Sequence, residues 1–177
     1  MFPGVQHEPE IEKEALLEKL LVVVDETLDK LLETRAREGE QLASLLSDRC
    51  EKIVELVAVA NNRMPEVLSN LRSKLIARVN ELVAEPNFDR LEQELVLLAQ
   101  KLDVAEELDR LQAHVKEVQR ALKQSEPIGR RLDFLMQEMN REANTLGSKS
   151  ADREMTQISI DLKVLIEQMR EQIQNIE

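Results

Sequence analysis

The chain has 177 residues and a formal net charge of −11, which argues against a surface that binds nucleic acid over its whole extent. It contains no Trp, no Tyr and three Phe, and this scarcity of aromatic residues favours long helices over a β-sheet. Its single cysteine excludes an internal disulfide and a thiolate metal cluster, and favours a reducing compartment.

An apolar stripe at helical spacing begins near the N-terminal end. After a loose segment at residues 1–7, the stripe predicts a helix over 8–61. Cys50 lies on the stripe, so we predict a small buried hydrophobic side chain there and no nucleophile. A polar interruption of the stripe indicates a kink, a break or a close approach by a partner, and we favour an unbroken helix through its residues, Arg35, Glu38 and Gly39.

Proline predicts the end of the first helix. The stretch Asn61 to Pro65 is predicted to be a turn, because the residue before a proline avoids the helical region. A long helical hairpin over 8–86 is then followed by a C-terminal helical region over 87–177. The fold class is all-α, with long antiparallel amphipathic helices that form an elongated helical bundle. The remaining helices are predicted over 66–83, 88–101, 104–124, 128–146 and 150–176.

Charge is unevenly distributed along the chain. Residues 1–100 carry 12 basic and 20 acidic side chains, whereas residues 101–153 carry 10 of each. Any anion-binding surface is therefore expected in the middle section, around the turn at 125–127. No secretion signal opens the sequence, and its longest apolar run is far shorter than the ~20 residues of a membrane span, so we predict a cytoplasmic protein.

The helix predicted over 104–124 gathers polar side chains along one edge. Histidine and carboxylates one to three turns apart can chelate a divalent cation, or the histidine can act as a general base. The alternative is an ordinary solvated face with surface ion pairs, which spacing alone favours. The residues on this edge are Asp103, Glu106, Glu107, Arg110, His114 and Glu117.

Residues 129–150 are the hardest to explain as packing alone. One face of the predicted helix is apolar and consists of Leu132, Leu135, Met136, Met139, Ala143 and Leu146. A second stripe contains Asp133, Gln137, Asn140, Arg141 and Asn144, and a third contains Arg131, Glu138 and Glu142. Asparagine is a poor helix former, so the amides indicate hydrogen bonds to a specific partner; the alternative is a buried polar network between helices.

The same segments carry a resemblance to a known family. Its longest motifs are LEQELVLLAQKLDVAEELDRLQAH at 91–114, GRRLDFLMQEMNREANTLGSKS at 129–150 and LKVLIEQMREQIQNIE at 162–177. With FPGV at 2–5 and RAREGEQL at 35–42, the sequence resembles the C-terminal region of the YicC/YloC family, described as divalent-metal-dependent bacterial endoribonucleases and often labelled stress-induced proteins. Family members have a separate N-terminal domain before the FPGV-like point, so we expect this chain to be the C-terminal part of such a protein.

The resemblance implies an endoribonuclease that acts on RNA with Mn²⁺ or Mg²⁺ and assembles as a homo-oligomer, a hexamer. On this interpretation the catalytic residues are His114, Glu107, Glu138 and Glu142. The metal ligands are Glu94, Asp103, Glu107 and His114. The RNA-binding residues are Arg110, Arg130, Arg131, Gln137, Asn140, Arg141, Asn144 and Lys149.

Two other classes of function stay open. One is a structural helical module that oligomerises through its polar stripes, and the other is an acidic adaptor that binds a protein through an exposed helix face. Phosphate-loop, dinucleotide-binding and zinc-protease motifs are absent from the sequence. We also expect the turn at 125–127 to fold two helices antiparallel, so that His114 faces the same polar space as Glu107 and the Arg141/Glu142 region.

Overall fold

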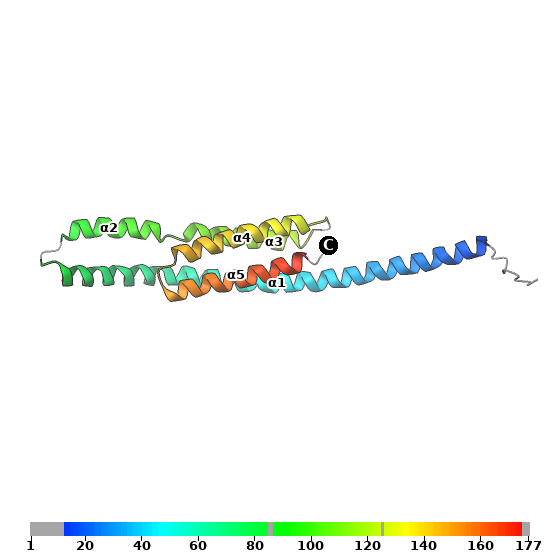
Figure 1. Ribbon diagram of the computed structural model, residues 1–177, viewed down its shortest axis with the longest axis horizontal. Helices are drawn as coiled ribbons and strands as arrows, with labels where there is room; N and C mark the ends of the chain where they lie inside the picture. The colour runs from blue at the N-terminus through cyan, green and yellow to red at the C-terminus, as the bar shows by residue number, and fades with distance from the viewer. Residues whose placement is uncertain (1–12, 85–86, 125, 175–177) are drawn as a thin grey trace, which may run out of the picture. The chain divides into compact units, whose positions relative to one another are not determined.

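The computed structural model describes residues 13–84, 87–124 and 126–174, and every regular element in these ranges is an α-helix. The all-α prediction is therefore confirmed. None of these helices is long and apolar enough to cross a membrane. The loose segment predicted at residues 1–7 lies outside the described residues. The helices are α1 (Lys13–Leu82), α2 (Phe88–Lys101), α3 (Ala105–Ala121), α4 (Gly129–Lys149) and α5 (Arg153–Gln174), shown in Figure 1.

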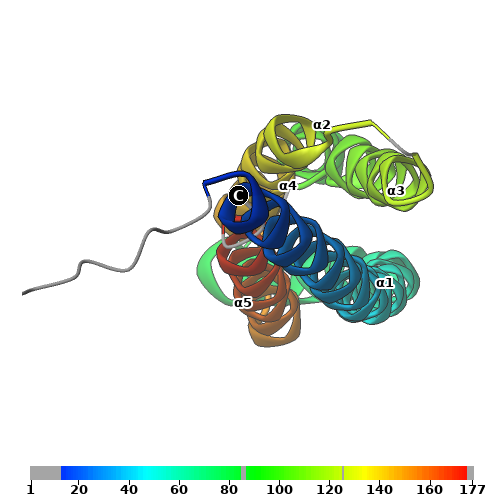
Figure 2. The ribbon, with the colours of Figure 1, turned by 90° about the vertical axis from the view of Figure 1, so that its right-hand side faces the viewer.

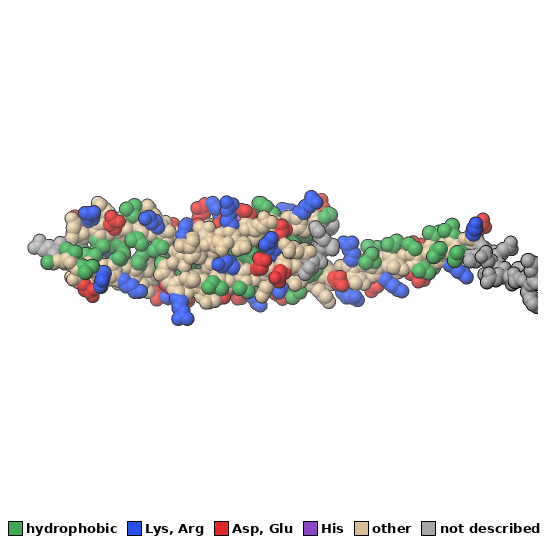
Figure 3. All heavy atoms as spheres, viewed as in Figure 1, with side chains coloured by type: hydrophobic (Ala, Val, Ile, Leu, Met, Phe, Trp, Pro, Cys, Tyr) green, Lys and Arg blue, Asp and Glu red, His purple; other side chains and the backbone are tan. Residues whose placement is uncertain are grey.

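The chain divides into two compact units, one ending at Gln41 and the other beginning at Leu42. The described part of the first unit is helical throughout, so the helix does pass through Arg35, Glu38 and Gly39 as predicted. Its apolar side chains are exposed, and Figure 3 shows them in green along this stretch of helix. They include Leu16, Leu17, Leu20, Leu21, Val24, Leu28, Leu31 and Leu32, which are between 46% and 65% exposed.

The second unit is a bundle of antiparallel helices. In Figure 2, α3 and α4 lie above α5 and the part of α1 that belongs to this unit. α4 packs against both α3 and α5. α1, α3, α4 and α5 each bury apolar side chains in the core of this unit, whereas α2 has no buried residue, and the predicted core face of residues 129–150 is buried. The largest fully buried side chains are Leu46, Ile53, Leu108, Leu111, Leu132, Met136, Met139, Leu146, Met155, Leu162, Ile166 and Met169.

Cys50 lies in this core. Its side chain is fully buried among the apolar residues of the second unit, as predicted. Burial disfavours the charged thiolate and, with a smaller contribution from Glu51, raises the pKa of the Cys50 thiol to about 11. The thiol is therefore protonated at neutral pH and has no nucleophilic role in the native fold.

α1 continues through Pro65, so the predicted turn at 61–65 and the helical hairpin over 8–86 are wrong. Proline removes one helical hydrogen bond, and the carbonyl that loses its donor belongs to the exposed Asn61. Residues on both sides of the proline are held in the core, since Ala60 and Val67 are buried and Met64 packs against them. Tertiary packing therefore outweighs the local preference for a break.

Side-chain oxygens accept backbone hydrogen bonds at the starts of three helices. Asn87 accepts a hydrogen bond from the Arg90 N–H at 3.0 Å at the start of α2. Asp103 accepts one from the Ala105 N–H at 3.0 Å at the start of α3. Asp152 accepts one from the Met155 N–H at 2.8 Å at the start of α5. Each carboxylate or amide satisfies a backbone donor that has no partner within its helix.

Asp152 also joins α5 to α1. Its Oδ1 accepts the capping hydrogen bond, while its Oδ2 lies 2.9 Å from a guanidinium nitrogen of Arg63. Burial acts to raise the pKa of Asp152, but the Met155 N–H and the Arg63 guanidinium together hold it below its ordinary value. One carboxylate thus fixes the start of α5 and its position on α1.

The C-terminal end of α4 depends on a close approach to α5. The helix runs to Lys149 and does not end at 146 as predicted. A Cβ atom at Gly147 would lie 2.5 Å from the Ser159 hydroxyl oxygen, and that hydroxyl donates a hydrogen bond to the Ala143 carbonyl at 2.9 Å. Glycine therefore provides the space in which α5 packs on α4, and it does not act as a helix terminator here.

We predict that Asp152→Asn lowers the free energy of unfolding by about 1 kcal/mol at pH 7, because asparagine keeps the cap and loses the charge that binds Arg63. A depressed folded pKa means that the ionised carboxylate stabilises the fold above its unfolded pKa and loses this effect as the pH falls through the folded pKa. Urea denaturation of both proteins between pH 7 and pH 3 should show the difference shrink toward zero. A difference that stays constant down to pH 3 would contradict this account.

Candidate functional site

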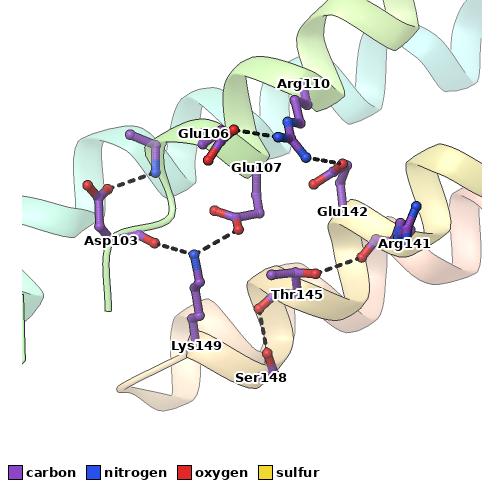
Figure 4. Close-up of polar contacts among 10 residues, drawn as sticks. Asp103, Glu106, Glu107, Arg110, Arg141, Glu142, Thr145, Ser148 and Lys149 are labelled. Carbon is purple, nitrogen blue, oxygen red and sulfur yellow. Dashed lines mark hydrogen bonds and ion pairs between the residues drawn. The ribbon is translucent and has the colours of Figure 1, made fainter. Parts of the chain in front are cut away.

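Two glutamates lie buried between α3 and α4. Glu107 on α3 is 7% exposed and Glu142 on α4 is 4% exposed. Figure 4 shows both carboxylates pointing into the space between the two helices. A carboxylate is costly to bury unless it is paired, so the neighbours of these two residues determine what the site can do.

Each of the two glutamates forms an ion pair with a cation on the opposite helix. The Glu142 carboxylate lies 3.3 Å from the Arg110 guanidinium, and the Glu107 carboxylate lies 2.8 Å from the Lys149 ammonium (Figure 4). Each helix therefore supplies one carboxylate and one cation. The hydrogen bond with Glu142 is the largest of the effects that raise the pKa of Arg110 above its ordinary value. We call Glu107, Arg110, Glu142 and Lys149 the crossed cluster.

One oxygen of the crossed cluster has no partner within the described part of the chain. Lys149 donates to Glu107 Oε1 and also, at 2.8 Å, to the backbone carbonyl of Asp103. Glu107 Oε2 is buried and accepts no hydrogen bond from any described residue. An unpaired buried carboxylate oxygen stays available for a donor from water or from a ligand.

The described residues do not assemble the predicted metal site. Among them, no three His, Cys, Asp or Glu side chains come close enough to hold a cation. Glu94 is exposed on α2, Asp103 caps α3, and Glu107 is bound by Lys149. The side chains of Glu94, Asp103, Glu107 and His114 are therefore not gathered at one point in the described part of the chain, and this ligand set stays a prediction. Glu94 lies within α2 and Asp103 lies between α2 and α3, while the ammonium of Lys149 binds the carboxylate of Glu107.

His114 lies on α3 two turns after Glu107. It is half-buried, and its ring makes no hydrogen bond or ion pair with any residue in the described ranges. Arg141 is 75% exposed and reaches only the half-buried Glu138, at 3.8 Å. The structure thus brings Glu107 and Glu142 together, and it places Arg141 and Glu138 outside their cluster.

The solvent face of α4 has no exposed carboxylate. The three acidic residues of this helix turn inward: Glu142 is buried, and Asp133 and Glu138 are half-buried. Three arginines remain outside on a chain whose net charge is −11. The exposed residues of α4 are Arg130, Arg131, Phe134, Gln137, Arg141, Asn144 and Ser148, and we call them the outer face of α4.

Most polar residues of the outer face make only local contacts. Gln137 donates to Asp133 at 2.8 Å, and Asn144 donates to Asn140 at 3.3 Å, each within one turn of α4. Arg131 binds Glu117 on α3 and donates to Gln124. Such exposed contacts are worth at most about 1 kcal/mol each, so a phosphate can replace them.

The predicted RNA-binding set therefore separates into two groups. Arg110 and Lys149 belong to the crossed cluster, where each binds a buried glutamate. The others lie on or beside the outer face of α4: Arg130, Arg131, Gln137, Asn140, Arg141 and Asn144. Only the second group is free to contact a ligand without breaking a buried ion pair.

Phe134 is a residue that the sequence interpretation missed. Its side chain is 58% exposed, and it lies one turn after Arg130 and two turns before Arg141. The signal was present in the spacing, because positions 130, 134, 137 and 141 fall on one side of a helix. Phe134 is not among the polar residues from which the site was predicted.

The chain is similar to a family and to proteins whose names describe them as endoribonucleases or probable endoribonucleases. A family model described as "Endoribonuclease YicC-like, C-terminal" matches residues 60–177. A protein named "Probable endoribonuclease YicC" from Haemophilus influenzae is 46% identical over 176 residues, which cover 99% of this chain and 61% of that protein. A protein of the same name from Clostridioides difficile is 37% identical over 181 residues, covering 99% of this chain and 62% of the relative. The chain thus spans about three fifths of the length of these relatives.

We predict that Lys149→Met lowers the free energy of unfolding by about 3 kcal/mol, because it leaves the buried Glu107 without a cation. Adding Glu107→Leu should recover most of this loss, since the double variant removes the unpaired charge as well. Urea denaturation measures both effects. Arg78→Met is the matched control, because it breaks an exposed pair with Glu81 and should cost less than about 1 kcal/mol. An equal cost for Lys149→Met and the control would show that the buried pair has no special role.

Proposed function

The chain belongs to the YicC-like endoribonuclease family, and on that premise we propose that it is the part of an endoribonuclease that holds RNA for cleavage of its phosphodiester bonds. The observation that carries this proposal is the outer face of α4, where three arginines are exposed and no carboxylate of the same helix is. Phosphate binding derives most of its affinity from arginine and lysine.

The acidic balance of the chain confines RNA to this face. A net charge of −11 repels phosphates from most of the surface, so attraction requires a place where basic side chains are not offset by neighbouring carboxylates. On the outer face of α4, Arg130 makes no ion pair with a described residue, and the carboxylates that reach Arg131 and Arg141 are half-buried, so positive charge predominates on the exposed surface of this helix. Its amide and hydroxyl groups, from Gln137, Asn144 and Ser148, can orient the sugar and phosphate by hydrogen bonds.

The crossed cluster has a supporting role in this proposal. Glu107 and Glu142 are each bound by a cation, so they fix α3 against α4 and thereby orient the outer face. His114 is half-buried and has no partner among the described residues, so it is the group that we assign to proton transfer. The predicted Mn²⁺ or Mg²⁺ stays a prediction, and no step of this proposal passes through a metal. The predicted hexamer also stays a prediction.

A helical oligomerisation module is the second candidate. The observation in its favour is the row of exposed leucines and valines on the described part of the first unit. Contiguous exposed apolar side chains on a helix are typical of a surface that packs on another protein. This function is compatible with RNA binding by α4, since it uses a different unit of the chain.

We predict that Arg130→Ala with Arg141→Ala weakens RNA binding and lowers the slope of log affinity against log salt by about 1.4, because two contacts to a single strand are lost. Fluorescence anisotropy with labelled RNA at several salt concentrations measures both quantities. The matched control is Arg78→Ala with Arg90→Ala, which removes two exposed arginines from α1 and α2. An equal change in the control would show that RNA binds without preference for α4.

We predict that His114→Ala abolishes cleavage of labelled RNA while RNA affinity and helical content remain unchanged, because it removes only the proton-transfer group. Cleavage is compared in Mn²⁺, Mg²⁺ and EDTA, and circular dichroism checks the fold. Full cleavage by a well-folded His114→Ala chain would end the catalytic assignment of this histidine. If the unmodified chain binds RNA but cleaves it in none of the three conditions, the cleavage part of the proposal is contradicted and the binding part stands.

A further inference from the structure

Phe134 is exposed at a position where packing gives no reason for it. The chain has only three phenylalanines and no other aromatic residue apart from its two histidines. Phe134 is 58% exposed, whereas its neighbours Leu132, Leu135 and Met136 on the inner face are at most 5% exposed. A large apolar side chain left in water forgoes the free energy of burial, and phenylalanine is not a favoured residue for an exposed helix position.

The surroundings of Phe134 are polar and cationic. Arg130 lies one turn before it on the outer face of α4, and Gln137 and Arg141 lie one and two turns after it. All of these side chains are exposed, and no exposed carboxylate of α4 interrupts them. An aromatic ring between arginines is the combination that binds single-stranded nucleic acid, because the arginines hold phosphates and the ring stacks on a base.

A protein-docking role does not fit these surroundings. Such surfaces have a contiguous apolar centre, but the exposed residues of α4 around Phe134 are arginines and amides. Apolar grooves of about 410 and 550 Å³ lie among the described residues of the second unit, one bounded by α1, α2 and α3 and the other by α1 and α5. Phe134 lines neither groove, so it is a lone aromatic residue in a polar face.

We propose that Phe134 stacks on an unpaired base of an RNA strand whose phosphates bind Arg130 and Arg141. This inference rests on the proposed RNA-binding function of α4 and specifies the kind of RNA. A base in a duplex already stacks on its neighbours and presents only its edges, so it cannot cover the ring. The face of α4 therefore selects single strands, loops or bulges. The base can be of any kind, because every base has a π face.

The absence of Trp and Tyr from the chain provides a direct test. Phe134→Trp introduces the only indole, so its fluorescence reports on this position alone. Titration with a single-stranded 12-nucleotide RNA should quench the emission by stacking and should give an affinity at least equal to that of the unmodified chain. The same sequence as a blunt duplex should leave the emission unchanged.

Phe134→Leu separates stacking from apolar contact. Leucine keeps much of the apolar surface and the helix but has no ring, so affinity for the single strand should fall by about 5- to 100-fold. The salt slope should remain unchanged, because no charge is removed. Affinity for the duplex should also remain unchanged. Phe88→Leu is the matched control, since Phe88 on α2 is likewise exposed, at 53%, and lies on a different helix.

The outcomes distinguish this inference from the function on which it rests. If Arg130→Ala with Arg141→Ala lowers the salt slope and Phe134→Leu binds the single strand normally, RNA binding stands and the stacking role is overturned. Equal losses for single strand and duplex would overturn it too. A changed oligomeric state of Phe134→Leu in light scattering would show that the ring contacts a second copy, and would also overturn it. If the unmodified chain binds neither the single-stranded RNA nor the duplex, both the RNA-binding proposal and the stacking proposal fail.

Discussion

The need to pair buried charge organises the second unit. Glu107 and Glu142 lie between α3 and α4, where an isolated carboxylate would be strongly unfavourable, and each is bound by a cation from the opposite helix. Both pairs join the same two helices, so sliding or rotating one helix against the other would break both of them together. They therefore specify a register between the helices that apolar contacts alone, which tolerate small shifts, would define less sharply.

The same pairing determines the character of the opposite side of α4. α4 has as many arginines as acidic residues, so their charges would cancel if both kinds were equally exposed, but here the arginines are exposed and the acidic residues are buried or half-buried. On the inner side of the helix, negative charge is paired with a cation of α3. The outer side exposes arginines and amides. An acidic protein thus obtains one cationic face without an excess of basic residues in its composition. Net charge alone could not have revealed this face, because it sums over both sides of the helix.

The sequence predicts the features that depend on local periodicity. The buried face of α4 follows from apolar residues at helical spacing, since burial of such a face is what stabilises a helix in a bundle. Pro65 and Gly147 show where this reasoning fails: their effects depend on packing by residues distant in sequence, such as Ser159 opposite Gly147. For the same reason, the contact between Arg63 and Asp152 left no local signal. The individual residues of the crossed cluster could be selected by type, but which cation binds which glutamate is decided only by how the helices meet.

Cys50 is an internal probe of how the helix bundle opens. The thiol is enclosed in the core and protonated at neutral pH, so a thiol reagent in solvent reacts only when the surrounding helices separate. Because the chain has no second cysteine, the rate of modification belongs to this one site. At low reagent concentration that rate reflects the fraction of time for which the core is open, as hydrogen exchange does for a buried amide. A side chain with no part in catalysis thereby reports the population of the open state of the core behind α4.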